Sequence, residues 1–352
     1  MQEIEQLINT LLDGKDLTSD QAIVAASLMA SPKVNSKAKE TFLIALSDKG
    51  ETATEVASFA AAFRKLAIDP AVEAWASHAV DVCGTGGDGS STFNISTAVS
   101  FIVAAAGVPV FKHGNRSITS KCGSADLIEG LGIRLDAPHE VLRESLKELN
   151  FCFFFAPAFH PAFKEIMPVR KVLAEQKRRS IFNLLGPMIN PGRPAYQLMG
   201  VFAQAWVEPI AGALDEIGLT AGLVAHCTPA EGLNLDELSC VGRNHVAGFG
   251  SFRSHSGDLR VEEAGLTRCG LESLRGGDVD DNIRTLNLIF NGQRKEVPDG
   301  LINSILLNAG AAFWITGRST DLRSGVDIAS EFLDSGRAGQ WLKKAQSFYA
   351  DK

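Results

Sequence analysis

The chain has 352 residues, of which 45% are hydrophobic and 21% charged, a composition typical of a folded globular protein and not of a disordered chain. Its length allows one large domain and a smaller one, each with a buried core. The formal net charge of -7 disfavours a broad nucleic-acid-binding or anionic-lipid-binding surface, so any polyanion must be bound by a local cluster or through a metal.

The sequence predicts a cytoplasmic protein without membrane segments. Its start, "MQEIEQLINTLL", lacks the basic region and apolar core of a signal peptide. The longest apolar run, Phe101 to Phe111, contains Gly107 and Pro109 and is shorter than the roughly 18 to 20 residues that span a bilayer. No Cys-x-x-Cys pair occurs, which predicts free structural thiols at Cys83, Cys122, Cys152, Cys227, Cys240 and Cys269.

Residues 1–70 show only helical patterns. Apolar residues recur at helical spacing from Ile4 to Leu12. "TSDQ" from Thr18 and "TATE" from Thr52 have the form of capping boxes, and Gly14 and Gly50 lie where helix C-caps would. We expect a small all-helical N-terminal domain of about four helices.

From Ala79 the pattern alternates between strands and helices. "AVDVC" predicts a strand, "STAVSFIVAAAG" a helix capped at Asn94 or Ser96, and "VPVF" a second strand, which together form a βαβ unit. Further strands are predicted at "FCFFFA", "YQLMGVF", "AGLVAHC", "HVAGFG" and "LRVEEA", and further helices at "HEVLRESLKELN", "PVRKVLAEQKRR", "AWVEPIAGALDEIG", "DDNIRTLNLIFNG" and "INSILLNAGAAFWITG". Residues 71–352 therefore predict a large α/β domain with a central, mostly parallel sheet.

Three loops are candidates for binding phosphate. The first, "GTGGDG" from Gly84, joins a strand to a helix and would expose backbone amides, although a tight connection is an equal alternative. The second carries Lys112, Asn115 and Arg116, and the third, "TSKCGSAD", carries Ser124. Because the first two loops follow neighbouring strands, they are expected at one carboxyl edge of the sheet. Three such loops indicate several phosphates.

A magnesium site is predicted from two consecutive acids. Asp236 and Glu237 follow a predicted strand by one loop, and Ser96 offers a hydroxyl ligand. Magnesium prefers a few carboxylates together with water and phosphate oxygens. The alternative is that both acids are solvated. His113 is expected to act through its backbone, and His160 to be a packed residue.

Nine motifs follow one another along the chain: "KGET" at Lys49, "GTGGD" at Gly84, "NIST" at Asn94, "KHGNR" at Lys112, "GSAD" at Gly123, "HPAFKEIMPVR" at His160, "IFNLLGPMINP" at Ile181, "LDELS" at Leu235 and "LLNAGAA" at Leu306. In this order they make the chain resemble the anthranilate phosphoribosyltransferase family over nearly its whole length. The resemblance implies a homodimer that contacts through its helical domains, the latter completed by helices around residues 161–190. It also implies transfer of the phosphoribosyl group from phosphoribosyl pyrophosphate to anthranilate, in tryptophan biosynthesis.

The resemblance also assigns site residues. Anthranilate would lie near Gly84 and Asn115, with its carboxylate at Arg170. Of two magnesium ions per subunit, one would take Ser96 and Glu237 and the other Asp236 and Glu237. No acid or base is assigned. Phosphoribosyl pyrophosphate would be held by Gly84, Gly87, Asp88, Thr92, Asn94, Ile95, Ser96, Thr97, Lys112, His113, Gly114, Asn115, Arg116, Ser117, Ile118, Thr119, Ser120 and Ser124.

The chain departs from the family pattern at two places. The segment after Arg170, "KVLAEQKRRSIFN", lacks the usual glycine and is about three residues longer, and Cys122 replaces a usual serine. Two alternatives remain open: a nucleoside phosphorylase of similar fold, and a non-catalytic nucleic-acid-binding relative. "KHGNR" and "LDELS" argue against the first, and the acidic charge argues against the second.

Overall fold

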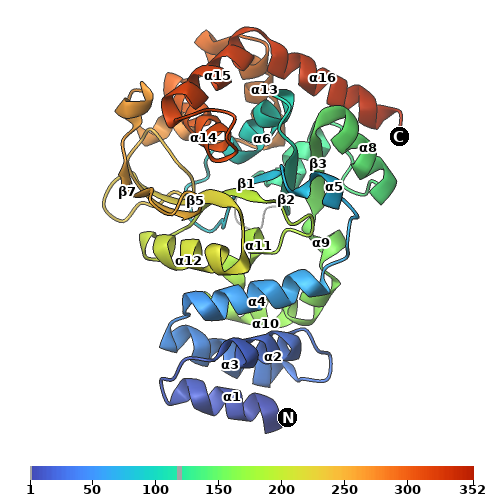
Figure 1. The fold of residues 1–352 in the computed structure, drawn as a ribbon, viewed down its shortest axis with the longest axis vertical. Helices are drawn as coiled ribbons and strands as arrows, with labels where there is room; N and C mark the ends of the chain where they lie inside the picture. Colours follow the sequence, from blue (N-terminus) through green and yellow to red (C-terminus); the bar gives the residue numbers. More distant parts are fainter. Residues whose placement is uncertain (1, 117–120) are drawn as a thin grey trace.

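The computed structural model describes residues 2–116 and 121–352. A layer of helices forms one end of the molecule, a twisted sheet crosses its middle, and a second group of helices covers the opposite face of the sheet (Figure 1). In the described ranges no helix is both long and apolar enough to cross a membrane. The predicted fold class, a small all-helical N-terminal region followed by a large α/β domain, is confirmed.

The helical layer is built from the N-terminal helices α1 (Gln2–Leu12), α2 (Ser19–Met29), α3 (Ser36–Lys49) and α4 (Ala53–Leu66). Both predicted capping boxes are present, because Thr18 caps α2 with Gln21 and Thr52 caps α4 with Glu55. Gly50 ends α3 in a conformation with φ of 90°, which suits glycine. Local sequence therefore determines where these helices begin and end.

The helical layer also contains a segment from the middle of the chain. Helix α10 (Met167–Glu175) packs against α3, and α11 (Phe182–Met188) packs against α4. Phe182 makes edge-to-face contacts with Phe59, Phe63 and Phe163, which place all four rings in one aromatic cluster. The layer is thus discontinuous in sequence, and residues 167–188 tie the α/β part of the chain to it.

The described residues form one seven-stranded sheet in the order β3-β2-β1-β4-β5-β6-β7. β1 to β5 are parallel, and β6 and β7 continue the sheet in antiparallel fashion. The strands are β1 (Val80–Gly84), β2 (Val110–Gly114), β3 (Phe151–Phe155), β4 (Tyr196–Gly200), β5 (Ala221–Thr228), β6 (Arg243–Gly250) and β7 (Ser256–Leu259). The chain moves outward from β1 to β3 in one direction and from β4 to β6 in the other, so a topological switch point lies between β1 and β4.

One predicted strand is wrong. "LRVEEA" from Leu259 contributes only its first residue to β7, and Val261–Ala264 forms a 3-10 turn. Val261 and Ala264 are buried on the same side of that turn, so their apolar character reflects a three-residue period and not strand alternation. Helix α10 likewise ends at Glu175, earlier than the predicted end at Arg179.

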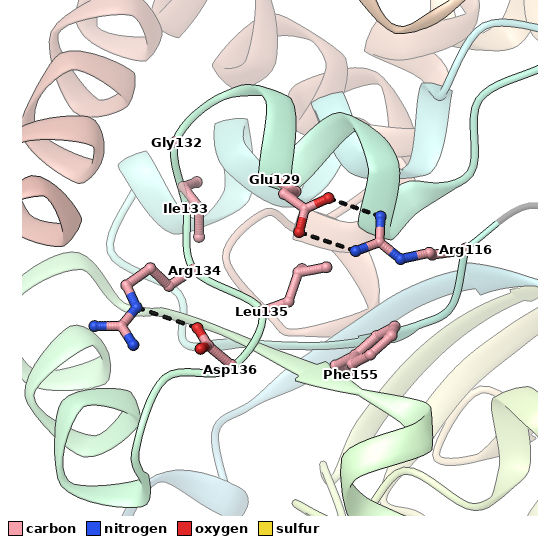
Figure 2. Close-up of a pocket in the computed structure, with 8 residues that line it drawn as sticks. All are labelled: Arg116, Glu129, Gly132, Ile133, Arg134, Leu135, Asp136 and Phe155. Carbon is pink, nitrogen blue, oxygen red and sulfur yellow. Dashed lines mark hydrogen bonds and ion pairs between the residues drawn. The ribbon is translucent and has the colours of Figure 1, made fainter.

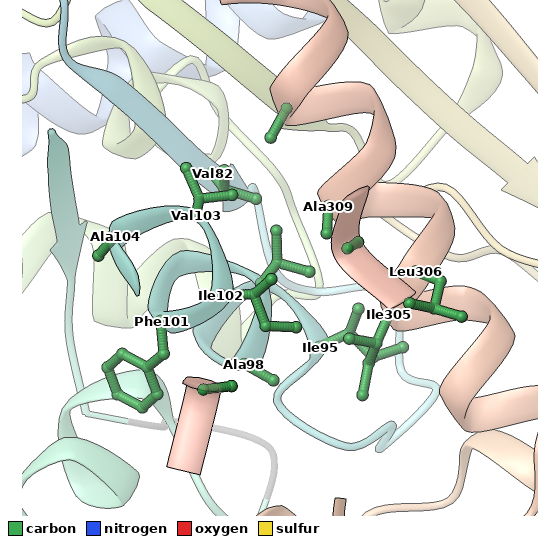
Figure 3. Close-up of a cluster of buried hydrophobic side chains, with 14 of the residues drawn as sticks. Val82, Ile95, Ala98, Phe101, Ile102, Val103, Ala104, Ile305, Leu306 and Ala309 are labelled. Carbon is green, nitrogen blue, oxygen red and sulfur yellow. The ribbon is translucent and has the colours of Figure 1, made fainter. Parts of the chain in front are cut away.

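The remaining helices cover the sheet. α6 and α14 pack together on one face, where Ile95, Ile102, Ile305, Leu306 and Ala309 lie in a common apolar cluster (Figure 3). The opposite face packs through α12 against the helical layer. The helices are α5 (Glu73–Ala76), α6 (Ile95–Ala105), α7 (Ser124–Gly130), α8 (His139–Leu149), α9 (Ala156–Phe159), α12 (Val207–Ile217), α13 (Val279–Phe290), α14 (Asp299–Ile315), α15 (Leu322–Asp334) and α16 (Arg337–Ala350).

Candidate functional site

The glycine-rich loop lies at the switch point between β1 and β4. It leaves β1 at Gly84 and enters α6 at Ile95. Gly86, Gly87 and Gly89 have φ of 70°, 78° and 76°, a left-handed conformation that side chains disfavour. Ligands in open α/β sheets bind outside the carboxyl ends of the strands at such a point, so the fold places this loop where an anion can approach its backbone.

The acidic segment reaches the same edge of the sheet. Gly84 and Gly200 pair in register at the ends of β1 and β4, and a Cβ on either would overlap Asp236. The Gly86 amide donates a 2.6 Å hydrogen bond to Asp236 Oδ2, and Thr92 Oγ1 donates one of 3.3 Å to Glu237 Oε1. The two acids therefore lie against the glycine-rich loop.

Three acidic side chains, Asp88, Asp236 and Glu237, lie close together at this site. Burial, together with nearby Asp88, raises the pKa of Asp236 to about 7. Burial also raises the pKa of Glu237, and repulsion from Asp236 and Asp88 acts in the same direction. No hydrogen-bonded cation balances Asp236 or Glu237 in the described part of the chain. Such a cluster disfavours its own ionised form unless a cation joins it.

Lys112 lies inside the sheet beneath the loop. Its Nζ donates to Val82 O at 2.9 Å and to Ser96 Oγ at 3.3 Å, and burial lowers its pKa. Within residues 2–116 and 121–352 no cluster of three His, Cys, Asp or Glu side chains forms a metal site by itself. A few carboxylates with a hydroxyl nearby nevertheless suit Mg²⁺, which completes its shell with water and phosphate oxygens.

The second and third loops are tied to each other. Ser124 Oγ donates to Asn115 O at 3.4 Å, and Ala125 N donates to the same oxygen at 3.3 Å. A Cβ on Gly114 would overlap Ser124 Oγ, so the loops approach closely only because residue 114 is glycine. The predicted donor residues Ser117, Ile118, Thr119 and Ser120 lie outside the described residues.

The Arg116 side chain pairs with two carboxylates of α7. Its guanidinium makes a two-fold contact with Glu129, at 2.7 and 2.9 Å (Figure 2). It also donates a bond of 3.1 Å to Asp126. Arg116, Glu129 and Phe155 lie beside a cavity of about 410 Å³ that Gly132, Ile133, Arg134, Leu135 and Asp136 also line. The Arg116 side chain is thus engaged by carboxylates outside the candidate donor site.

Two other predicted donor residues have their side chains in the core. Ile95 and Thr97 are fully buried, and their amides donate to Phe93 O and Asn94 O. Only their backbone could face a ligand. Between them, Ser96 is half-buried and presents its hydroxyl to Lys112.

Sequence reasoning missed a segment that supports the donor loops. Asn282 is buried and its Nδ2 donates to Asn94 Oδ1 at 2.9 Å, while Asn94 Nδ2 donates to Cys122 O at 3.1 Å. Gly277 N donates to Asn282 Oδ1 at 2.8 Å. The only sequence signal was "RGGD" ahead of a helix, a second pair of glycines before a cap. This chain of amides joins three loops that are far apart in sequence.

The proposed acceptor side lies toward the helical layer. Arg170 is half-buried on α10, and burial alone lowers its pKa because no charged neighbour in the described chain contributes. Its guanidinium carbon lies 5.9 Å from the Phe163 ring centroid, and Phe163 in turn lies 5.8 Å from His160. An unbalanced cation beside an aromatic ring suits an aromatic carboxylate.

His113 and His160 form a buried pair. Their Nε2 atoms lie 3.1 Å apart, and His113 Nδ1 lies 3.1 Å from Gly186 O. Because a carbonyl only accepts, His113 donates from Nδ1 and accepts at Nε2 from His160. Burial lowers the pKa of His113 to about 3 and of His160 to about 4, so both rings are neutral at pH 7. The expectation that His160 is packed is correct, but its partner was not foreseen.

None of the six cysteines, all of which the structure describes, forms a disulfide, as predicted. Burial raises the pKa values of Cys83 and Cys122, which disfavours the thiolate form. Neither is therefore suited to act as a nucleophile. Cys122 contributes to the site through its carbonyl, which accepts from Asn94.

Two family models cover most of the chain. Residues 5–67 match the helical bundle domain of the glycosyl transferase family, and residues 76–339 match the a/b domain of that family. Among curated proteins, anthranilate phosphoribosyltransferase of Bradyrhizobium diazoefficiens is 38% identical over 97% of this chain and 98% of its own. The enzyme of the same name from Methanosarcina mazei is 39% identical over 96% of this chain and 87% of its own.

Solved structures agree with these sequence relatives. Anthranilate phosphoribosyltransferase of Thermus thermophilus superposes with a TM-score of 0.85 at 38% identity, covering 98% of this chain and 99% of that one. The Saccharomyces cerevisiae enzyme, in complex with PRPP and Mg, has a TM-score of 0.83 at 22% identity, covering 99% and 98%, and shows a shared fold. The chain aligns with these relatives over nearly its full length, both domain models match it, and the fold is shared. It therefore belongs to the anthranilate phosphoribosyltransferase family.

Proposed function

We propose that this protein transfers the phosphoribosyl group of phosphoribosyl pyrophosphate to the amino group of anthranilate, releasing pyrophosphate, in tryptophan biosynthesis. The observation that carries the proposal is the meeting of three features at one sheet edge. These are the glycine-rich loop, the end of β2 with Lys112, and the acidic pair Asp236 and Glu237. Relatives of the same name align over nearly the full length.

The donor's pyrophosphate is held by loop amides, hydroxyls and Lys112, while Ser96 and Glu237 hold one Mg²⁺ and Asp236 and Glu237 a second. Bound Mg²⁺ supplies positive charge that stabilises the leaving pyrophosphate. Fixed amides act in the same sense, because negative charge develops on the leaving group as its bond to ribose C1 breaks. A Mg-bound relative supports the metal, and the crowded acids of this chain fit it.

Anthranilate is oriented through its carboxylate at Arg170, near Gly84 and Asn115. Its amine is neutral at pH 7, so the nitrogen lone pair attacks C1 directly and the surplus proton passes to solvent. No residue is required as a strong base, and the neutral His113 and His160 fit this requirement. Catalysis then rests on positioning two substrates, which contributes several kcal/mol in favourable cases.

Further features belong to the same proposal. Residues 1–70 form the helical domain, completed by helices from residues 161–190, and residues 71–352 form the α/β domain. The subunit pairs with a second copy through the helical domain, and the protein works in the cytoplasm. Neither a nucleoside phosphorylase nor a nucleic-acid-binding relative is favoured by the full-length relatives.

The test is direct. When purified protein is mixed with phosphoribosyl pyrophosphate, Mg²⁺ and anthranilate, the fluorescence of anthranilate should decrease. One pyrophosphate should be released for each anthranilate consumed. Removal of Mg²⁺ with a chelator should stop the reaction, and aminobenzoates with the carboxylate in other ring positions should react poorly. Absence of turnover over a wide range of substrate concentrations would reject the proposal, and phosphorolysis of thymidine or uridine would replace it with the phosphorylase alternative.

A further inference from the structure

Two consecutive arginines follow helix α10 and have different partners. Arg178 Nη1 pairs with Asp48 Oδ1 of α3 at 2.6 Å. The carbonyl of Arg179 accepts from Ser47 Oγ, also in α3, at 3.2 Å. The backbone at Arg179 is therefore anchored to the helical layer, and it lies in the segment that is about three residues longer than the family pattern.

The side chain of Arg179 crosses from the helical layer to the glycine-rich loop. Its Nη2 donates a 2.8 Å hydrogen bond to Gly87 O, and its guanidinium carbon lies 3.8 Å from the centroid of the Phe202 ring. Phe202 is buried and follows β4, and its amide donates to Thr85 Oγ1 at 3.0 Å. We call the contacts of Arg179 with Gly87 and Phe202 the arginine bridge.

The arginine bridge acts on the loop at Gly87, the residue that follows the Gly86 amide bound to Asp236. Gly86 and Gly87 are glycines in the left-handed region, which lose more conformational freedom on ordering than other residues do. A trans peptide is planar, so fixing the Gly87 carbonyl toward Arg179 also fixes the Asp88 N–H, which points the opposite way. The bridge thus sets the direction of an amide in the loop proposed to cradle pyrophosphate.

We propose that Arg179 is a positioning residue for the donor: the arginine bridge holds the glycine-rich loop in its anion-binding conformation from the helical layer. The proposal rests on the proposed function, because it concerns how the same donor site is organised. Preorganised donors bind more tightly, since less ordering remains to be done when the ligand arrives.

The chemistry of the bridge requires arginine. A planar guanidinium can stack on Phe202 and donate in its own plane to Gly87 O, whereas a lysine ammonium cannot do both. Arg179→Lys is therefore expected to behave like Arg179→Ala. Arg178→Ala is the matched control, because it removes an equal charge from the same segment without touching the loop.

The experiment compares these variants in the full-length protein. Arg179→Ala should raise the KM for phosphoribosyl pyrophosphate and its calorimetric dissociation constant with Mg²⁺ by about tenfold, which corresponds to about 1.4 kcal/mol. The anthranilate KM and the unfolding temperature should stay unchanged, and Arg178→Ala should bind the donor like wild type. Phe202→Leu should weaken donor binding too, and the double variant should be no weaker than Arg179→Ala alone.

Several outcomes would overturn the inference. Arg179→Ala could bind the donor as Arg178→Ala does, or it could raise the KM for anthranilate instead. Full donor affinity in Phe202→Leu or Arg179→Lys would mean that the positive charge at residue 179 matters and the stacked guanidinium does not. Wild-type protein that binds the donor but does not use anthranilate would reject the proposed acceptor and leave the bridge testable by calorimetry.

Discussion

Arg170 is a half-buried cation whose charge no neighbour in the described chain balances. Its Nη1 donates to the Met167 sulfur at 4.0 Å, and its guanidinium carbon lies 5.9 Å from the Phe163 ring centroid. Burying an unpaired charge costs free energy, so a ligand carboxylate would relieve that cost on binding. This environment is consistent with the proposed role of Arg170 as the partner of the acceptor's carboxylate.

Arg170→Ala should raise the KM for anthranilate, while the KM for phosphoribosyl pyrophosphate stays near the wild-type value. Loss of a hydrogen bond between charged groups costs about 1.5 to 3 kcal/mol, or roughly ten- to hundredfold in KM. Steady-state kinetics by anthranilate fluorescence would measure both values. The neighbouring exposed Lys171 provides the control, and equal effects of Lys171→Ala and Arg170→Ala would remove Arg170 from the acceptor site.

The pair of His113 and His160 gives a pH dependence to stability. Their folded pKa values of about 3 and 4 lie below the ordinary value of about 6.5, so below that pH the unfolded chain binds protons that the folded chain does not. The stability that the neutral pair contributes is fully present above pH 6.5 and falls as the pH drops toward 4.

His160→Gln should reduce this pH dependence, because glutamine can still donate to His113 Nε2 but does not titrate. Between pH 7.5 and pH 5.5 each buried histidine lowers the free energy of unfolding by about 1.4 kcal/mol. Urea unfolding at both pH values measures this decrease in the free energy of unfolding. The decrease should be smaller in the variant than in the wild type by that amount. An identical loss in wild type and variant would mean that His160 is protonated in the folded protein.

At the scale of elements, the site depends on how closely three segments approach one another. The ends of β1 and β4 carry Gly84 and Gly200 in register, and the acidic segment after β5 passes directly over both. A side chain at either position would push Asp236 and Glu237 away from the glycine-rich loop. The glycines here are required by close packing of backbone on backbone, not by a turn.

Gly200→Ala should therefore lower the rate of phosphoribosyl transfer by more than about a hundredfold, since a misplacement of about 1 Å in a positioned group already lowers a rate by that factor. Half-maximal activity should also require more Mg²⁺. Gly212→Ala in α12 is the control, because its Cβ meets only Ala53 at an ordinary 3.6 Å. Normal activity of Gly200→Ala would show that the acidic segment does not have to lie where it does here.

At the scale of the whole molecule, the helical layer leaves apolar side chains in solvent. Leu12 is 69% exposed on α1 and Ile23 is 38% exposed on α2, whereas the buried apolar residues of these helices face the layer's core. Burial of such residues against a second copy would remove their apolar surface from water. They are thus suited to the proposed dimer.

Leu12→Glu combined with Ile23→Glu should shift the protein from dimer to monomer in light scattering after size exclusion. Each added carboxylate would have to be desolvated at the interface. Leu233→Glu, at a leucine that is 46% exposed in a loop of the α/β part, should leave the mass unchanged. A wild-type mass equal to one subunit would reject the dimer, and an unchanged dimer in the double variant would move the interface elsewhere.

The sequence by itself determined the features that depend on neighbours along the chain. Capping boxes at Thr18 and Thr52, the helix stop at Gly50 and the strands from Val80 to Gly250 were all predicted, because caps, turns and periodicity are local. Strand order also brought Lys112 and the glycine-rich loop to one edge. The failure at Val261 came from a short apolar run whose period was ambiguous.

Only the tertiary structure decided which distant groups meet. The partners Asn282 with Asn94, His160 with His113, and Arg179 with Gly87 are separated by long stretches of chain, and no local pattern encodes such contacts. The pairing of Arg116 with Glu129 was likewise invisible in "KHGNR". Residue types identify the chemistry that a chain can perform, whereas burial and packing decide which charges are paired and which stay available for a ligand.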